Sequence, residues 1–134
     1  MMVFRILIVD DDEDARILLQ RALCKGGFHD VEIDTAADGR EALERIAAAP
    51  PHVVITDVMM PRMNGFELCA ALRGTAATAA IPVMIVTALE DESDRARGHA
   101  VGANDYLTKP ILWSDFAARL LALLGTANGI GRDR

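Results

Sequence analysis

The sequence predicts a doubly wound α/β fold, in which helices cover both faces of a five-stranded parallel sheet and form a three-layer sandwich. Two patterns predict it. Short apolar runs alternate with helical patterns five times along the 134 residues, and β-branched residues dominate the first four runs, as buried parallel strands require. The expected strands are Ile6–Val9, Val31–Thr35, Val53–Thr56, Val83–Thr87 and the shorter Asp105–Leu107.

Apolar residues between these strands recur at helical spacing. The expected helices contain the stripes at 15–23, 42–47, 68–72 and 116–124, together with Asp91–Ala100. Charged residues dominate Asp91–Ala100, so we expect this helix to be held loosely. Start signals support other helices, namely Asp38 with Glu41, Asn64 with Glu67, and Ser114.

Length and composition limit the class of protein. The 134 residues fit one domain, and 51% of them are hydrophobic, which is enough for a layered core. Because the net charge is −6, we do not expect direct contact with nucleic acid. Cys24 and Cys69 lie in expected helices and are interpreted as small buried hydrophobes in a reducing compartment.

The sequence contains no pattern of a membrane span or a signal peptide. No run of about 18 apolar residues predicts a membrane span, and Met1–Arg5 lacks the layout of a signal peptide. We therefore expect a cytoplasmic protein with no membrane partner. Residues 1–125 form the expected domain, and the glycine-rich residues 126–134 are expected to be a flexible tail or the start of a linker.

Carboxylates follow two of the expected strands at the point where each strand ends. Asp10 and Asp11 come directly after Ile6–Val9, and Asp57 follows Val53–Thr56. In a doubly wound sheet the carboxyl ends of the strands form the rim where ligands bind. Carboxylates crowded at one rim repel each other, so a bound cation such as Mg²⁺ would offset their charge.

Thr87 and Lys109 are expected at the same rim, because Thr87 ends the fourth expected strand and Lys109 follows the fifth. This set of groups suits phosphoryl transfer. Asp57 can attack phosphorus to form an aspartyl-phosphate. The metal and Lys109 would offset charge on the transferring group, and Thr87 could donate a hydrogen bond to a phosphoryl oxygen.

Four segments carry a resemblance to a known family. They are ILIVDD at 6–11, DVMMPRMNG at 57–65, PVMIVTA at 82–88 and GANDYLTKP at 102–110. In this order and spacing they resemble the receiver domain of two-component response regulators, over roughly Arg5 to Leu124. The resemblance implies a flavodoxin-like fold with the strand order 2-1-3-4-5.

The resemblance also implies a role for individual residues. Asp57 resembles the phosphoacceptor. Direct Mg²⁺ ligands are implied at Asp11, at Asp57 and at the main-chain carbonyl of Met59, while Asp10 would act largely through water. Carboxylate and carbonyl oxygens are the ligands that Mg²⁺ prefers in proteins.

Three further residues are implied to respond to the phosphoryl group. Thr87 resembles the switch hydroxyl, Lys109 the phosphate-binding lysine, and Tyr106 the aromatic residue whose rotamer changes with Thr87. A lone tyrosine at a strand edge can equally be a packing residue with a wet hydroxyl. The family also has a cis peptide bond at the position that matches Lys109 and Pro110.

The function implied by the resemblance is that of a signalling switch and not of an enzyme. The chain would take phosphate from a sensor histidine kinase or a histidine phosphotransfer protein. The face formed by residues 91–100, 105–107 and 116–124 would then change its affinity for a downstream partner, and a homodimer is an open alternative. The chain is either a stand-alone single-domain regulator or the receiver part of a longer protein.

Two other protein classes share parts of this pattern. A hydrolase of the haloacid-dehalogenase type also uses an aspartate nucleophile and Mg²⁺, and residues 10–12 contain its Asp-x-Asp pattern. That family expects Thr or Val where this chain has Asp14, and it usually needs a cap insertion. A flavodoxin-like cofactor carrier would need a glycine- or hydroxyl-rich phosphate loop after the first strand, where this chain has the acidic residues 10–14.

Two apolar residues lie next to the expected site. Met59 follows Asp57 by two residues, and Leu89 follows Thr87 by two. An apolar side chain over the phosphoryl group cannot orient an attacking water. We therefore expect slow self-dephosphorylation.

Overall fold

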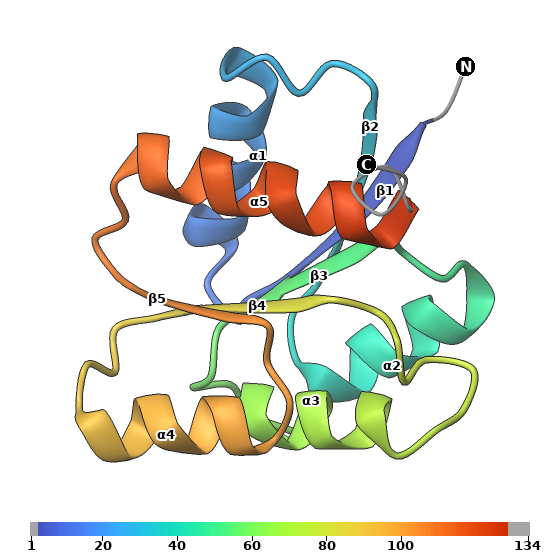
Figure 1. Cartoon of the computed structure of the whole chain (residues 1–134), viewed down its shortest axis with the longest axis vertical. Helices are drawn as coiled ribbons and strands as arrows, with labels where there is room; N and C mark the ends of the chain where they lie inside the picture. The colour runs from blue at the N-terminus through green and yellow to red at the C-terminus, as the bar shows by residue number, and fades with distance from the viewer. Residues whose placement is uncertain (1–2, 129–134) are drawn as a thin grey trace.

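The computed structural model describes residues 3–128, and a five-stranded sheet forms its centre (Figure 1). The sheet order is β2-β1-β3-β4-β5, and all neighbouring strands are parallel, which confirms the predicted fold class. The strands are β1 (Phe4–Val9), β2 (Val31–Ala36), β3 (Val53–Thr56), β4 (Val83–Thr87) and β5 (Asp105–Thr108). The helices are α1 (Glu13–Lys25), α2 (Gly39–Ala48), α3 (Gly65–Arg73), α4 (Glu92–Ala100) and α5 (Trp113–Asn128).

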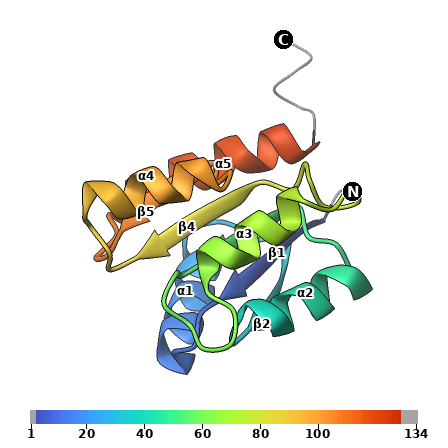
Figure 2. The same ribbon diagram turned by 90° about the horizontal axis from the view of Figure 1, so that it is seen from below.

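The helices cover both faces of the sheet, with α1 and α5 on one face and α2, α3 and α4 on the other (Figures 1 and 2). Successive residues of a strand point to opposite faces. In β1, Leu7 and Val9 join the core formed with α2 and α3, whereas Ile6 and Ile8 join the core formed with α5. Both faces of this strand are therefore buried, which explains why its apolar run is unbroken.

Side-chain caps fix the start of three helices. Asp12, Asp38 and Asn64 each accept a hydrogen bond from a backbone N–H of the first turn. Asn64 and Glu67 complete a capping box, because each side chain accepts from the other residue's backbone N–H, at 2.8 and 2.9 Å. The helix α5 begins at Trp113, so the expected start signal Ser114 lies inside its first turn.

The two cysteines differ in burial. Cys69 is buried in α3, and its thiol lies 3.4 Å from the carbonyl oxygen of Val101. Cys24 is exposed on α1, so its interpretation as a buried hydrophobe is wrong. The reason is helical geometry: the neighbouring Leu23 takes the inward position, and consecutive residues of a helix point in different directions.

The helix α4 buries little of its own surface. Gly98 is its one buried residue, and Asp91 at its N-terminus makes no side-chain capping bond. A Cβ at Gly98 would lie 2.7 Å from the ring of Tyr106, so the helix approaches β5 closely at this point. Arg95 donates to the carbonyl oxygen of Tyr106 at 3.1 Å and lies over its ring. That α4 is loosely held stays a prediction, because Arg95 and the close approach at Gly98 join the helix to β5.

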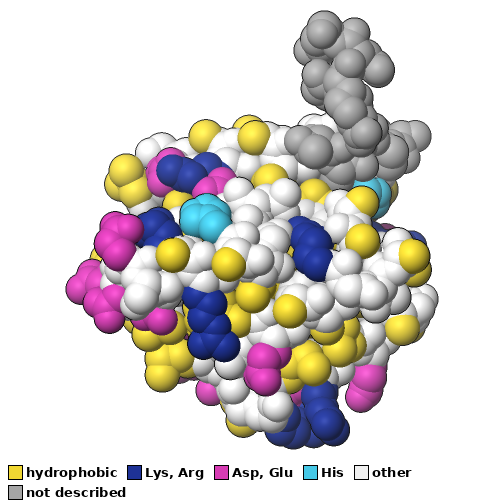
Figure 3. Space-filling view, turned by 60° about the horizontal axis from the view of Figure 1, so that its bottom comes forward, with side chains coloured by type: hydrophobic (Ala, Val, Ile, Leu, Met, Phe, Trp, Pro, Cys, Tyr) yellow, Lys and Arg dark blue, Asp and Glu magenta, His cyan; other side chains and the backbone are white. Residues whose placement is uncertain are grey.

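Charged side chains of both signs are interspersed on the side of the molecule where α3 and α4 lie (Figure 3). On this side, Lys and Arg side chains are separated by hydrophobic and acidic ones and form no continuous basic patch in the part of the surface that is described. The absence of direct nucleic-acid contact stays a prediction.

The lengths and ends of the helices bear on the expected absence of a membrane span and on the expected C-terminal tail. Among the helices of residues 3–128, none combines the length and the apolar character needed to cross a membrane. The helix α5 reaches Asn128 and so includes residues 126–128 of the segment expected to be a tail or linker. The rest of that segment, 129–134, lies outside the described residues.

Two adjacent leucines of α5 test the predicted core. Leu120 is fully buried, whereas Leu121 is 59% exposed. We expect Leu120→Ala to lower the free energy of unfolding by about 2–5 kcal/mol, because it removes buried methyl groups and leaves a cavity. The matched control Leu121→Ala should change it by less than about 0.5 kcal/mol. Urea denaturation measures both, and similar losses in the two variants would contradict the packing of α5.

Candidate functional site

The carboxyl ends of four strands bring together the polar residues that the sequence separates. Asp10 and Asp57 directly follow β1 and β3, Thr87 ends β4, and Lys109 directly follows β5. Backbone hydrogen bonds hold these ends in register. The N–H of Asp57 donates to the main-chain carbonyl of Val9 at 2.9 Å, and the N–H of Lys109 donates to the main-chain carbonyl of Thr87 at 2.8 Å. The sheet therefore fixes where each of these residues starts.

Lys109 links the two carboxylates. Its ammonium nitrogen Nζ lies 3.0 Å from Oδ2 of Asp57 and 3.1 Å from Oδ2 of Asp10. The carboxylate side chains are only 13% and 9% exposed, whereas the Lys109 side chain is 34% exposed. One ammonium thus faces two largely buried carboxylates, which is a strong charge-assisted arrangement.

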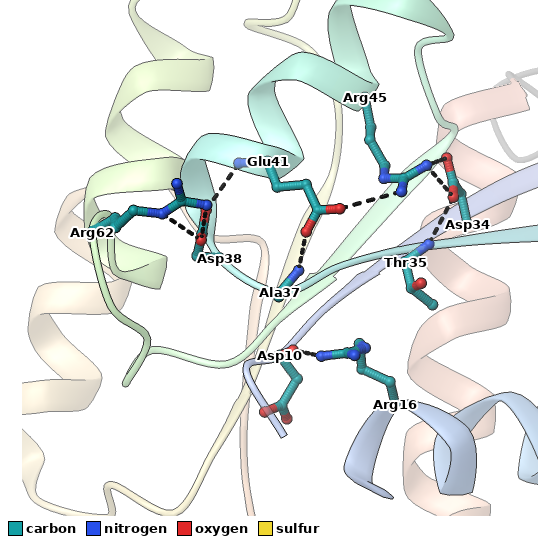
Figure 4. A network of polar contacts seen from close by, with 9 residues as sticks. All are labelled: Asp10, Arg16, Asp34, Thr35, Ala37, Asp38, Glu41, Arg45 and Arg62. Atoms are coloured by element: carbon teal, nitrogen blue, oxygen red, sulfur yellow. Dashed lines mark hydrogen bonds and ion pairs between the residues drawn. The ribbon is translucent and has the colours of Figure 1, made fainter. Parts of the chain in front are cut away.

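The remaining carboxylate oxygens of this pair are held by the backbone. Oδ1 of Asp57 accepts from the N–H of Val58 at 2.6 Å, and Oδ1 of Asp10 accepts from the N–H of Asp12 at 3.0 Å. Arg16 of α1 donates to the main-chain carbonyl of Asp10 at 2.6 Å, as Figure 4 shows. Both carboxylates are therefore oriented before any ligand arrives.

Burial and charge shift the pKa of two of these groups in the same direction. Burial raises the pKa of Asp10, although the Asp12 N–H and Lys109 act against this shift. Burial acts to lower the pKa of Lys109, but its hydrogen bonds to Asp57 and Asp10 outweigh burial, and the pKa is raised. Lys109 therefore stays cationic at neutral pH.

Asp11 and Met59 lie at an exposed part of the rim. Both line a shallow hollow together with Val58, Met60 and Asn64, and the Met59 side chain is 63% exposed. Within residues 3–128, no cluster of three or more His, Cys, Asp or Glu side chains is arranged to hold a metal ion. A set made of two carboxylates, a main-chain carbonyl and water is compatible with this finding. It also has the hard oxygen donors that suit Mg²⁺.

Thr87 and Tyr106 contact the backbone of the same residue. The N–H of Leu89 donates to the Thr87 hydroxyl over a long 3.4 Å, and the Tyr106 hydroxyl donates to the Leu89 carbonyl at 2.8 Å. Thr87 is fully buried, and Tyr106 is 3% exposed. Burial raises the pKa of Tyr106, so its hydroxyl stays protonated and able to donate. The peptide bond between Lys109 and Pro110 is cis.

Two features near the site had no sequence signal. A cavity of about 750 Å³ lies between α1 and the sheet, with Asp10, Asp57 and Lys109 in its wall and mostly apolar side chains around it. The apolar stripe of α1 predicts an inward face but not how far that face lies from the sheet. Arg16 was also missed, because its contact is with a backbone carbonyl and depends on the direction in which α1 leaves β1.

Comparison with known proteins matches residues 6–121 to the family model of the response regulator receiver domain. Curated relatives include the response regulator MprA of Mycolicibacterium vanbaalenii, which is 44% identical over 123 residues, and MprA of Mycobacterium tuberculosis, which is 43% identical. Both alignments cover 92% of this chain and 51% of the relative. The chain thus spans about half the length of the curated relatives it matches.

Solved structures of similar fold point to the same family. A putative response regulator from Chloroflexus aurantiacus matches with a TM-score of 0.85 and 35% identity, covering 92% of this chain and 99% of that one. The chemotaxis protein CheY4 of Vibrio cholerae matches with a TM-score of 0.81 and 34% identity, covering 91% and 99%. The likeness extends over nearly the whole described fold.

The raised pKa of Asp10 predicts an effect of pH on stability. Because the folded state disfavours the ionised carboxylate, ionisation of Asp10 costs stability at pH values above its folded pKa. The cost disappears as the pH falls below the ordinary value of 3.8, where the group is protonated in both states. We therefore expect Asp10→Asn to raise the free energy of unfolding at pH 7 without divalent ions, and the gain to fade in acid.

Urea denaturation in EDTA across this pH range measures the effect. Asp30→Asn is the control, because Asp30 is an exposed residue away from the rim. A less stable Asp10→Asn variant at pH 7 would show that attraction to Lys109 outweighs the cost of burial.

Proposed function

Because the chain belongs to the family of response regulator receiver domains, we propose that it is the phosphoacceptor switch of a two-component phosphorelay. The proposed donor is the phosphohistidine of a sensor histidine kinase or a histidine phosphotransfer protein. The observation that carries the proposal is the contact of the Lys109 ammonium with both Asp57 and Asp10 at the carboxyl edge of the sheet. It combines a nucleophile, an acidic neighbour and a cation in one place.

The proposed reaction is transfer of one phosphoryl group. A carboxylate oxygen of Asp57 forms a bond to phosphorus while the phosphorus–nitrogen bond of phosphohistidine breaks, and the histidine leaves with the electron pair. The Lys109 ammonium lies next to the nucleophile and offsets charge on the transferring group. Burial of Asp57 excludes much of the water that would weaken this attraction.

A magnesium ion would be held by Asp11, Asp57 and the main-chain carbonyl of Met59, with Asp10 contributing through water. When bound, the ion would neutralise charge on the phosphoryl oxygens and on the acidic rim. Lys109 already offsets part of that charge, because it contacts two of these carboxylates. The Val58 N–H orients Oδ1 of Asp57 before the ion binds.

The proposed response to phosphorylation passes through Leu89. The phosphoryl group adds negative charge at the rim, and the Thr87 hydroxyl donates a hydrogen bond to it. Thr87 then releases the Leu89 N–H, the loop before α4 moves, and Tyr106 loses or changes its contact with the Leu89 carbonyl. The weakly held α4 shifts, and the face of α4, β5 and α5 changes its affinity for a downstream partner or a second copy.

The arrangement of the whole protein is part of the proposal. The matched relatives are about twice as long as the aligned region, so this domain would act either as a stand-alone regulator or as the receiver part of a longer protein. The proposed output is a change of binding and not the turnover of a substrate. The cytoplasmic location expected from the sequence stays a prediction.

Replacement of the proposed phosphoacceptor gives the direct test. Incubation with acetyl phosphate and Mg²⁺ should add one phosphoryl group to the wild type, and Asp57→Asn should abolish this labelling because an amide is not a nucleophile of this kind. Intact-mass spectrometry measures the stoichiometry, and the exposed Asp30→Asn serves as the control. Full labelling of Asp57→Asn would overturn the assignment. Sustained turnover of a phosphomonoester by the wild type would favour the hydrolase alternative.

The Met59 side chain provides a separate test of the lifetime. Because it is exposed at the rim and cannot orient water, the wild-type phospho-form should persist well beyond seconds. We expect Met59→Asn to decay several times faster, while Met59→Leu keeps the slow rate. Both changes preserve the main-chain carbonyl. Loss of the phosphoryl group can be followed by mass spectrometry, and a wild-type half-life of seconds would contradict the expectation.

A further inference from the structure

We infer that Asp38 and Arg62 are positioning residues that hold the loop between β3 and α3 in the geometry that Mg²⁺ requires. We call their ion pair the Asp38–Arg62 latch. The loop, residues 57–64, contains the proposed phosphoacceptor Asp57 and the carbonyl of Met59. The inference rests on the proposed function, because it assumes that Mg²⁺ binds there.

The latch joins the loop to the start of α2. Oδ2 of Asp38 accepts from Nε of Arg62 at 2.8 Å and from Nη2 at 2.5 Å, while Oδ1 accepts from the N–H of Glu41 at 2.9 Å (Figure 4). The Asp38 side chain is 5% exposed, whereas that of Arg62 is 62% exposed. A largely buried carboxylate thus receives a guanidinium that reaches in from the surface. The Glu41 N–H and Arg62 lower the pKa of Asp38, so it is ionised at neutral pH.

Arg62 has a backbone conformation that few residues with side chains adopt. Its φ is +64°, and the N–H of Met63 donates to the carbonyl of Pro61 at 2.7 Å, across a three-residue turn. Turns of this kind are strained and persist where surrounding contacts hold them. The two hydrogen bonds from Arg62 to Asp38 can hold this turn, because Arg62 is its central residue.

Backbone contacts next to the latch leave the loop little freedom. The N–H of Gly39 donates to the Met63 carbonyl at 3.0 Å, and a Cβ at Gly39 would lie only 2.6 Å from Met63 Cγ. At the other end, the N–H of Gly65 donates to the Val58 carbonyl at 2.9 Å. Arg62 and Met59 therefore lie in one short segment that is fixed at both ends, at Val58 and at Met63.

Pre-organisation explains what the latch would contribute. A carbonyl that is held in one position before the ion binds loses less conformational freedom on binding than one in a mobile loop. Residues that support metal ligands without touching the metal typically change metal affinity by about 10- to 100-fold when they are replaced. Arg62 is exposed and lies outside the core, so its removal should act on the loop more than on global stability.

The test measures Mg²⁺ affinity of the unphosphorylated protein by isothermal titration calorimetry, beside its unfolding free energy in EDTA. Arg62→Asn removes the guanidinium while keeping a residue that tolerates positive φ. Asp38→Asn removes the charge while keeping a helix cap. We expect the dissociation constant to rise by about tenfold for Arg62→Asn, with partial rescue by Arg62→Lys. The double variant should bind Mg²⁺ no more weakly than the weaker-binding single variant, because each single replacement already breaks the same ion pair.

Arg45→Gln is the matched control. Arg45 lies on the same helix α2 and pairs with Asp34 and Glu41, but it does not contact the loop (Figure 4). Its replacement should leave Mg²⁺ affinity unchanged. If Arg62→Asn lowers stability in EDTA without changing the dissociation constant, the pair is only structural and the inference is wrong.

Asp57→Asn distinguishes a failure of the latch from a failure of the proposed metal site. If it loses Mg²⁺ affinity while the latch variants bind as tightly as the wild type, the latch fails and the proposed function stands. If Asp57→Asn binds Mg²⁺ as tightly as the wild type, the proposed metal site itself fails. Should Asp38→Asn not fold, the comparison of Arg62→Asn with Arg62→Lys still decides, because Arg62 is an exposed residue.

Discussion

The contact between one ammonium and two carboxylates is the constraint on which the site depends. Asp10 and Asp57 follow adjacent strands of the sheet, and the two carboxylates would repel each other if no cation contacted both. Lys109 follows β5, which lies two strands away from β3 in the sheet. Its side chain extends past the carboxyl end of β4 and contacts both carboxylates. The four strands β1, β3, β4 and β5 must therefore lie in this order before the charges can balance.

The two-sided sheet explains why polar chemistry gathers at one edge. Both faces of β1, β3 and β4 are covered by helices, so the strand ends are where polar groups can meet solvent. The backbone register carries each side chain to the rim, and short loops hold it there. Stability comes from the apolar layers, whereas the rim contains groups, such as Asp10, whose burial works against stability.

Much of the fold followed from local pattern. The apolar strands and the cap residues Asp38 and Asn64 could be predicted, because burial on both faces and helix starts leave signals within a few residues. The acidic rim could be predicted from strand ends and from family resemblance. The exposure of Cys24 could not be predicted, because an apolar stripe at helical spacing does not fix the exact rotation of the helix about its axis. The pairing of Arg62 with Asp38, 24 residues away, depends on how two loops approach each other, which no local pattern contains.

The backbone of Leu89 has a further consequence. Its N–H contacts Thr87 and its carbonyl contacts Tyr106, so in the proposed response this one residue would connect the two polar side chains. Both contacts use backbone atoms, which every amino acid other than proline possesses. If the proposed response uses these contacts, the side chain at this position can be replaced without removing either of them.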